Sequence, residues 1–235
     1  MSQHPSTQPL ELPHELRAHH RRWAFLDLET TGLTAPIGVV QVGIEVVDFD
    51  DLGNASVAAR LSICTDPGLP HEATALAVHG MAAGDLVAGR TAPLSLHGLT
   101  CTETDREPID HIDPVVRAWP EAAREATAWL AALRPDSIAC WGDYDFLVLE
   151  ALAGRDAPTV ELPPANAYLD LQALYRERFA GTGADRTSTR LAKAAEAFGL
   201  GAPQAHRALA DAELARRVFV AMADHAAAEA ACGAA

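Results

Sequence analysis

The sequence predicts a single α/β domain in which helices flank a mixed sheet. Extended, β-branched segments come first, and shorter extended segments then alternate with helical ones, which is typical of a layered α/β fold. The chain has 235 residues, 49% apolar and 21% charged, so it can bury one sizeable core. The first strands are expected to pair as an antiparallel meander, and the later strands to add in parallel.

Three strands and a short helix are expected in the first third of the domain. The first strand begins at Trp23 and is stopped by Thr30-Thr31-Gly32. Residues 39–47 are β-branched and extended, and 55–64 would complete the meander after a turn-rich segment. Proline and glycine then break the third strand, and residues 71–78 favour a short helix.

Short strands alternate with helices in the remainder of the chain. The turn residues and apolar spacing predict strands over 137–141 and 167–169. They predict helices from Pro120 to about 134, and over 143–153, 171–179, 188–198 and 206–229.

The chain divides into an arm, a domain and a short tail. Residues 1–22 are rich in Pro, His and Gln and are expected to form a flexible arm, and 229–235 form an Ala-rich tail. The single domain spans 23–228 and carries an insertion at about 82–113. The first residues lack the apolar centre of a secretory signal, and no apolar run is long enough to cross a membrane, so a cytoplasmic location is expected.

The net charge of −14 argues against broad, non-specific binding to duplex nucleic acid. The charge is uneven, with 7 basic and 22 acidic side chains in residues 23–168 but 8 and 6 in residues 169–217. An anionic polymer would therefore meet the last third of the chain first, although ordinary fluctuation explains the same numbers. The four cysteines form no C-x-x-C pair, which excludes a zinc ribbon and favours buried thiols.

Two carboxylates lie at the end of the first strand. Side chains alternate along a strand, so Phe25, Asp27 and Glu29 share one face. Neighbouring carboxylates repel one another and lose solvation on burial, and a divalent cation such as Mg²⁺ or Mn²⁺ removes both penalties. A solvated strand end that feeds a turn is the alternative for an isolated D-x-E pair.

A third carboxylate lies on the apolar stripe of the last helix. Asp211 precedes Leu214 and Ala215 by three and four residues, so it shares their face and points toward the core. A partly exposed aspartate in the first helical turn is the equal alternative. His206 lies five residues earlier, off that face, in the segment that leads into the helix.

The segment Trp141-Gly142-Asp143-Tyr144-Asp145 supplies a fourth carboxylate. Asp143 suits the cap of the following helix. Asp145 lies four residues before Leu149, an apolar position, and is expected to face inward. Asp145 is therefore the predicted functional residue of the two.

Together these segments resemble the motifs of the DnaQ-like DEDDh 3′–5′ exonucleases, a family of the ribonuclease H-like superfamily. Residues 25–33, FLDLETTGL, resemble the first motif, and residues 206–212, HRALADA, resemble the third motif in its histidine subtype. The second motif is represented by WGDYD at 141–145, which lacks the His-Asn start of many members and is closest to the histone-mRNA and ERI-type RNA exonuclease branch. The resemblance covers roughly residues 23–225, and the 82–113 segment is longer than in the family.

The resemblance implies a ribonuclease H-like fold and hydrolysis with two Mg²⁺ or Mn²⁺ ions. Asp27, Glu29, Asp145 and Asp211 would hold the metals, and His206 would act as general base. The product would be a nucleoside 5′-monophosphate.

The resemblance also implies a pocket for the 3′-terminal nucleotide beside the first motif. Its expected residues are Thr30, Thr31, Gly32 and Leu33, with His79 and Met81 on the other side. Core packing is the alternative for Leu33. The acidic body favours single-stranded or short 3′ ends over long duplex, and the second motif favours RNA over DNA.

Two other functions stay open at this point, a proofreading subunit bound to a polymerase and a catalytically silent nucleic-acid-binding module. Formation of a homodimer also stays open. Residues 82–113 hold too many apolar side chains for a solvated linker, so at least half of this segment is expected to be ordered against the domain or a second chain.

Overall fold

The computed structural model describes residues 20–33, 36–79, 109–156, 168–179, 189–201 and 207–233. Its centre is a six-stranded sheet with the strand order β4-β3-β2-β1-β5-β6. The strands are β1 (Arg22–Thr30), β2 (Val39–Phe49), β3 (Ala55–Asp66), β4 (Ile109–Ala118), β5 (Ser137–Cys140) and β6 (Tyr168–Asp170). The helices are α2 (Ala73–His79), α4 (Trp119–Leu133), α5 (Tyr144–Asp156), α6 (Leu171–Arg178), α7 (Leu191–Ala197) and α8 (Ala208–Gly233).

The predicted antiparallel meander is confirmed. β1 pairs antiparallel with β2, and β2 pairs antiparallel with β3. β5 adds to the other edge of β1 in parallel, and β6 adds to β5 in parallel. The sheet is therefore mixed, as the sequence predicts.

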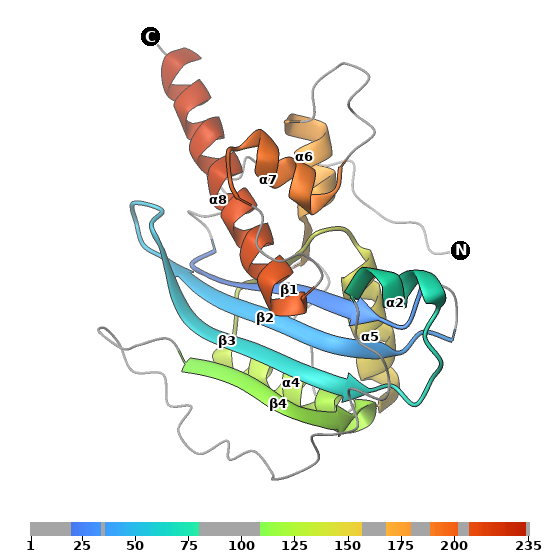
Figure 1. The fold of residues 1–235 in the computed structure, drawn as a ribbon. Helices are drawn as coiled ribbons and strands as arrows, with labels where there is room; N and C mark the ends of the chain where they lie inside the picture. The colour runs from blue at the N-terminus through green and yellow to red at the C-terminus, as the bar shows by residue number, and fades with distance from the viewer. Residues whose placement is uncertain are drawn as a thin grey trace.

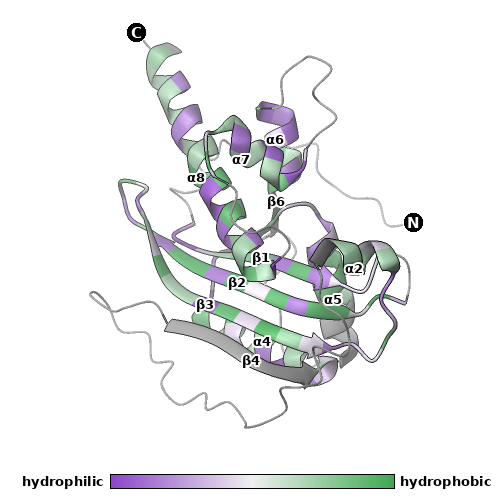
Figure 2. Cartoon of the chain, viewed as in Figure 1, coloured by the Kyte–Doolittle hydropathy of each residue, from purple (hydrophilic) through white to green (hydrophobic). Residues whose placement is uncertain are grey.

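Helices cover both faces of the sheet, and each face has its own core. Ala24, Leu26 and Leu28 of β1 pack in one apolar cluster with α4 and α5. Trp23 and Phe25 pack in the other cluster with α6, α7 and α8. Figure 1 shows α8 lying across the strands on one side and α4 behind them, and Figure 2 shows apolar and polar residues intermixed along β1 to β3. The alternation predicted for the first strand is thus what divides the two cores.

Strand β4 is an element that the sequence analysis missed. Residues 109–118 pair in parallel with β3 and extend the sheet beyond the predicted meander. Their alternation is interrupted by Asp110, Asp113 and Pro114, so periodicity alone gave no strand there. The last five residues of the predicted 82–113 insertion therefore belong to the sheet, and residues 80–108 lie outside the described part of the chain.

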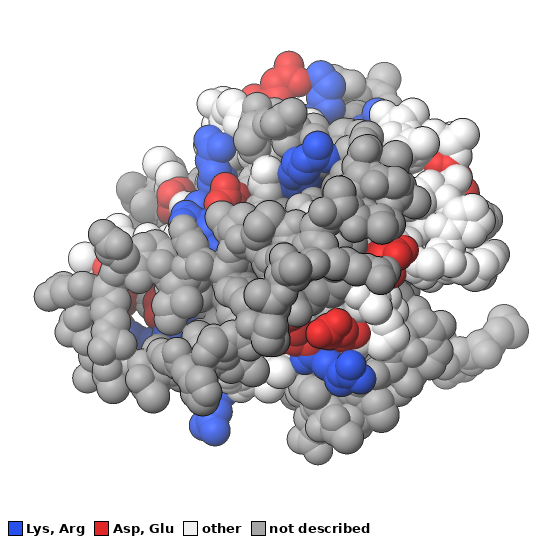
Figure 3. Space-filling model, turned by 60° about the horizontal axis from the view of Figure 1, so that its bottom comes forward, with Lys and Arg blue, Asp and Glu red and all other residues white. Residues whose placement is uncertain are grey.

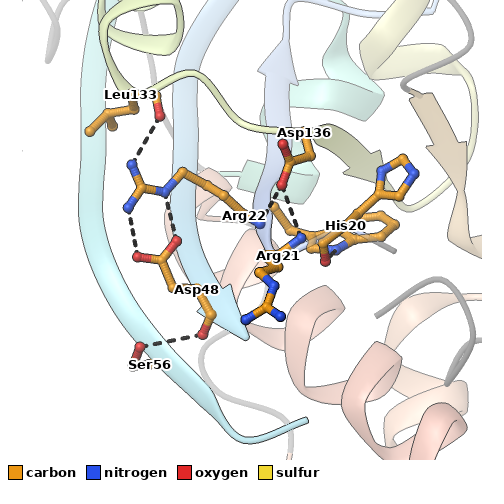
Figure 4. Close-up of polar contacts among 8 residues, drawn as sticks. His20, Arg21, Arg22, Asp48, Ser56, Leu133 and Asp136 are labelled. Carbon is orange, nitrogen blue, oxygen red and sulfur yellow. Dashed lines mark hydrogen bonds and ion pairs between the residues drawn. The ribbon is translucent and has the colours of Figure 1, made fainter. Parts of the chain in front are cut away.

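The start of β1 is fixed by polar contacts that Figure 4 draws. The Arg22 guanidinium donates to both carboxylate oxygens of Asp48, at 2.6 and 2.7 Å, and to the Leu133 carbonyl at 3.1 Å. The Asp136 carboxylate accepts from the backbone N–H groups of Arg21 and Arg22. These contacts tie β1 to its neighbour β2 and to the turn before β5. The ordered strand thus begins at Arg22, one residue before the predicted start of the domain.

The helix boundaries differ from the prediction mainly at the last helix. α8 continues to Gly233, through residues that the sequence analysis assigned to a tail from 229, because its Ala-rich end has high helix propensity. Among the described residues, no helix is long and apolar enough to cross a membrane. Figure 3 shows acidic and basic side chains interspersed on one face of the molecule.

Candidate active site

The end of β1 brings two carboxylates to the α8 side of the sheet. Asp27 and Glu29 continue the face on which Phe25 packs against α8, so they are directed toward that helix. Asp27 pairs with Gly43 of β2, and Glu29 pairs with Gln41. The predicted common face of Phe25, Asp27 and Glu29 is what places both acids beside the first turn of α8.

The first turn of α8 supplies the third carboxylate. Asp211 lies three residues after Ala208, where α8 begins, and its backbone N–H donates to the Arg207 carbonyl. Ala212, Leu214, Ala215 and Val218 of the same helix are buried in the core cluster of this face. Asp211 borders that buried stripe, so the interpretation of an inward-directed aspartate is the one that the fold supports.

The start of α5 supplies the fourth carboxylate. Gly142 turns the chain after β5 with a backbone φ of +102°, a conformation that residues other than glycine rarely adopt. Asp145 then lies in the first turn of α5 and is only 8% exposed, whereas Asp143 is exposed just before the helix. The choice of Asp145 over Asp143 as the inward residue is therefore supported by burial.

Three of these acids form a compact cluster. Asp27, Glu29 and Asp211 each offer a carboxylate oxygen, and these oxygens lie within 4.8 Å of one another. Burial, and then the charges of Asp145, Asp211 and Glu29, raise the pKa of Asp27 well above its ordinary value. The cluster thus concentrates negative charge in a partly buried place.

The neighbouring carboxyl groups are affected in the same direction. Burial, followed by the charge of Asp211, raises the pKa of Glu29 to about 7, against a lowering effect of Arg207. Burial and the charge of Glu29 raise the pKa of Asp145 to about 7, although a hydrogen bond from the Leu28 backbone lowers it. At neutral pH, acids with such raised pKa values keep protons unless a cation compensates their charge.

An all-carboxylate donor set of this kind suits a hard divalent cation such as Mg²⁺ or Mn²⁺. Asp27, Glu29 and Asp211 are close enough to share one ion, and the charge of Asp145 acts on the same group. The residues present therefore fit the metal centre that the sequence predicts.

A pocket of about 300 Å³ opens beside this cluster. It contains the three predicted residues Thr30, Gly32 and Leu33, and Leu33 is 75% exposed, so Leu33 is not a core residue. The remaining lining residues are Leu28, Glu29, Glu72, Thr74, Ala75 and Tyr144. The pocket shares Glu29 with the acidic cluster, so a molecule bound in it lies next to the carboxylates.

The loop after β1 shapes the rim of this pocket. The Tyr144 hydroxyl donates to the Gly32 carbonyl at 2.8 Å, and the Glu72 backbone N–H donates to the Thr31 carbonyl at 2.7 Å. A Cβ atom at Gly32 would overlap the Glu72 side chain. The Glu72 side chain thus occupies the space that a side chain at position 32 would take.

Thr31 has a different role from the one that its neighbours have. Its backbone N–H donates to the Gly38 carbonyl at 2.8 Å, and its hydroxyl accepts from the Gly38 N–H at 2.9 Å. Thr31 therefore closes the loop between β1 and β2, and it does not line the pocket. Its amide is therefore engaged within the loop.

Three predicted residues cannot be placed. Met81 and His206 lie outside the described residues, and for His79 only the backbone at the end of α2 is described. Arg207, which follows His206 directly, is described, and its charge acts on Glu29. The roles expected of His79, Met81 and His206 stay predictions.

Comparisons with known proteins are informative at the level of structure. No protein-family model matches the chain, and no curated protein matches it by sequence. A structure described as the nuclease domain of 3′hExo, a DEDDh family member bound to rAMP, matches with a TM-score of 0.61 at 12% identity, over 88% of this chain and 94% of that one. The chain shares the fold of that nuclease domain.

Two further structures with this fold are similar over most of the chain. A 3′-exonuclease described in 3′-end specific recognition of a histone mRNA stem-loop matches with a TM-score of 0.60 at 12% identity, over 88% of this chain and 83% of that one. The zinc-bound E. coli ExoI–ssDNA complex matches with a TM-score of 0.56 at 16% identity, over 87% of this chain and 40% of that one. The ribonuclease H-like fold that the sequence resemblance implies is thereby confirmed.

Sequence reasoning missed two contributors to the pocket of the exonuclease-like fold. Tyr144 lies one residue before Asp145, and the same turn that buries Asp145 directs the Tyr144 ring to the pocket. Glu72 lies just before α2, and nothing in the sequence around it indicates that its side chain lies against Gly32. The position of Tyr144 next to Asp145 in WGDYD could have indicated its place in the pocket. No comparable sequence pattern indicates the place of Glu72.

Proposed function

We propose that this protein is a metal-dependent 3′–5′ exonuclease that releases nucleoside 5′-monophosphates from single-stranded or short nucleic acid. The observation that carries the proposal is the acidic cluster of Asp27, Glu29 and Asp211 at the edge of a nucleotide-sized pocket. The chain shares its fold with a nuclease domain bound to rAMP and with a 3′-exonuclease described in recognition of a histone mRNA stem-loop, which supports the same activity.

The four carboxylates are proposed to hold two Mg²⁺ or Mn²⁺ ions. Bound ions would lower the pKa of water and offset the negative charge that develops on the phosphate oxygens. Asp27, Glu29 and Asp211 lie close enough to act together, and Asp145 adds its charge from α5. The raised pKa values of Glu29 and Asp145 fit residues that ionise fully only when a cation is bound.

The pocket is proposed to hold the 3′-terminal nucleoside. Tyr144, Leu28 and Leu33 offer apolar surface for a base, and Glu29, Thr30 and Glu72 offer oxygen acceptors for sugar hydroxyls. A nucleotide whose base and sugar occupy the pocket has its 5′ phosphate next to the carboxylates, because Glu29 belongs to both the pocket and the cluster. His206 is proposed to take the proton of the attacking water as general base.

Single-stranded ends are the preferred substrates in this proposal, and RNA is preferred over DNA. The net charge of −14 limits how many backbone phosphates the protein can neutralise, which disfavours long duplex. The preference for RNA rests on the WGDYD segment and on the RNA and rAMP named for the two compared exonuclease structures.

The test is shortening of 5′-labelled oligonucleotides of one sequence, made as single-stranded RNA, single-stranded DNA and blunt DNA duplex. Purified protein is incubated with Mg²⁺, Mn²⁺ or EDTA. We expect a ladder of labelled products that are progressively shorter at the 3′ end. It should form only with metal and fastest on single-stranded RNA. Cleavage that persists in EDTA, or no shortening of any substrate, would contradict the proposed activity, and faster degradation of duplex would contradict the substrate class.

A further inference from the structure

Strand β2 carries a polar stripe on the face that meets α8. Gln41, Gly43 and Glu45 alternate along the strand and lie opposite Glu29, Asp27 and Phe25 of β1 in the antiparallel register. Gln41 is 8% exposed and Glu45 is fully buried, in a strand whose other buried side chains are apolar. Buried polar side chains need partners, and here the partners come from α8 and β3.

Gln41 binds the backbone at the first residue of α8. Its side-chain oxygen accepts the Ala208 N–H at 3.1 Å, one of the N–H groups that the first turn of a helix cannot pair internally. Its amide nitrogen donates to the Ser62 hydroxyl of β3 at 3.2 Å. The Ala208 N–H can only donate, so it requires the Gln41 amide oxygen to face the helix, while the Ser62 hydroxyl binds the amide nitrogen at the other end. The helix start is thereby held at a set place on the sheet.

Gly43 and Glu45 extend the same contact along α8. A Cβ atom at Gly43 would overlap the Ala208 carbonyl carbon and the Leu209 nitrogen, so the helix lies directly on the strand at this point. Glu45 accepts from Arg216 at 2.5 Å and from Arg60 at 3.3 Å. Two contacts two turns apart, at Ala208 and Arg216, fix the rotation of the helix about its axis.

We propose that Gln41 is a positioning residue for the Asp211 carboxylate. Gln41 lies opposite Glu29 in the sheet and holds the helix residue three positions before Asp211. It therefore sets the separation between the carboxylates that β1 supplies and the one that α8 supplies. This role deepens the proposed function and rests on it, because the separation matters only if the cluster binds metal.

The test compares Gln41→Leu with Gln41→Glu in the full-length protein. Leucine removes the acceptor for the Ala208 N–H at similar size, whereas glutamate keeps an acceptor and adds a like charge opposite Glu29. Mn²⁺ affinity is measured from free Mn²⁺ by electron paramagnetic resonance, without nucleic acid. Loss of a hydrogen bond to a metal ligand typically costs 10–100-fold in metal affinity. Gln41 acts one step further out, through the Ala208 backbone, so we expect the lower end of that range, with Gln41→Leu binding Mn²⁺ about tenfold more weakly.

Gln41→Glu distinguishes positioning from simple structural support. If Gln41 only supports the stability of the sheet, Gln41→Glu should weaken Mn²⁺ binding as well, since a like charge directly opposite Glu29 destabilises the pair. Positioning predicts that Gln41→Glu binds Mn²⁺ at least as tightly as wild type, because the helix contact is kept. Weakening by both variants to the same degree would overturn the proposal.

Thr127→Val is the matched control for loss of a buried hydrogen bond elsewhere. Thr127 is fully buried in α4, on the opposite face of the sheet, and its hydroxyl donates to the Ala123 carbonyl at 2.7 Å. This variant should lose stability and keep wild-type Mn²⁺ affinity. Wild-type affinity in Gln41→Leu would refute the role of Gln41 alone, whereas a wild-type protein that binds no Mn²⁺ would refute the proposed function and this role with it.

Discussion

Neutralising Asp145 should stabilise the metal-free protein at neutral pH and not in acid. The pKa of Asp145 is raised in the fold from 3.8 to about 7, first by burial and then by the charge of Glu29. A raised pKa means that the folded state favours the protonated acid. The resulting stabilisation is complete below the unfolded pKa and is lost as the pH rises through the folded one.

The magnitude follows from the two pKa values. Moving from 3.8 to about 7 corresponds to about 4 kcal/mol, of which roughly half or more is lost between pH 5 and pH 8. Asparagine carries no charge at either pH and keeps an oxygen for the hydrogen bond from the Leu28 backbone. Asp145→Asn should therefore gain about 2 to 3 kcal/mol relative to wild type when the pH is raised from 5 to 8 in EDTA.

The assay is urea unfolding of wild type and Asp145→Asn, followed by circular dichroism at both pH values. Asp143→Asn is the matched control, since it removes the charge of an exposed aspartate two residues away. Adding Mn²⁺ should stabilise wild type more than Asp145→Asn, because a ligand that binds only the folded state shifts the equilibrium toward it. An Asp145→Asn variant whose relative stability is the same at pH 5 and pH 8 would refute the electrostatic account of the cluster.

Three further predictions concern activity. His206→Ala should lower the rate by about 10²–10⁴ with Mn²⁺ affinity retained, and a pH–rate profile unchanged from wild type would count against His206 as base. Tyr144→Ala should raise KM by about tenfold or more, since stacking of a base on an aromatic ring contributes about 1–3 kcal/mol, while Tyr144→Phe should stay near wild type; equal KM values in all three proteins would remove Tyr144 from the pocket. Deleting residues 91–107 should raise the rate on long relative to short substrates, because the segment is acidic, and an unchanged ratio would show that it does not restrict access.

The sequence predicted the sheet centre and the acidic cluster well for one physical reason. Both depend on local periodicity, which places Phe25, Asp27 and Glu29 on one face of a strand and Asp211 beside the apolar stripe of a helix. Asp145 was distinguishable from Asp143 on the same ground, by its spacing to Leu149. The resemblance to the DEDDh motifs added that these separate patterns meet at one site.

The parts that the sequence did not predict depend on contacts between distant segments. β4 pairs with β3 although its alternation is broken, and only the neighbouring strand makes its residues extended. Glu72 reaches the pocket because Gly32 leaves room for it, which no pattern around Glu72 indicates. The contact of Gln41 with Ala208 likewise joins residues 167 positions apart.

The central claim is that the carboxylates of β1 and α8 hold metal ions that drive removal of the 3′-terminal nucleotide. The most direct measurement is release of label from a 3′-terminally labelled RNA by wild type and by Asp27→Asn, at pH 8 with Mn²⁺, with circular dichroism to show that both are folded. We predict that wild type releases a labelled nucleoside 5′-monophosphate and that Asp27→Asn releases none. Full release by folded Asp27→Asn would contradict the claim.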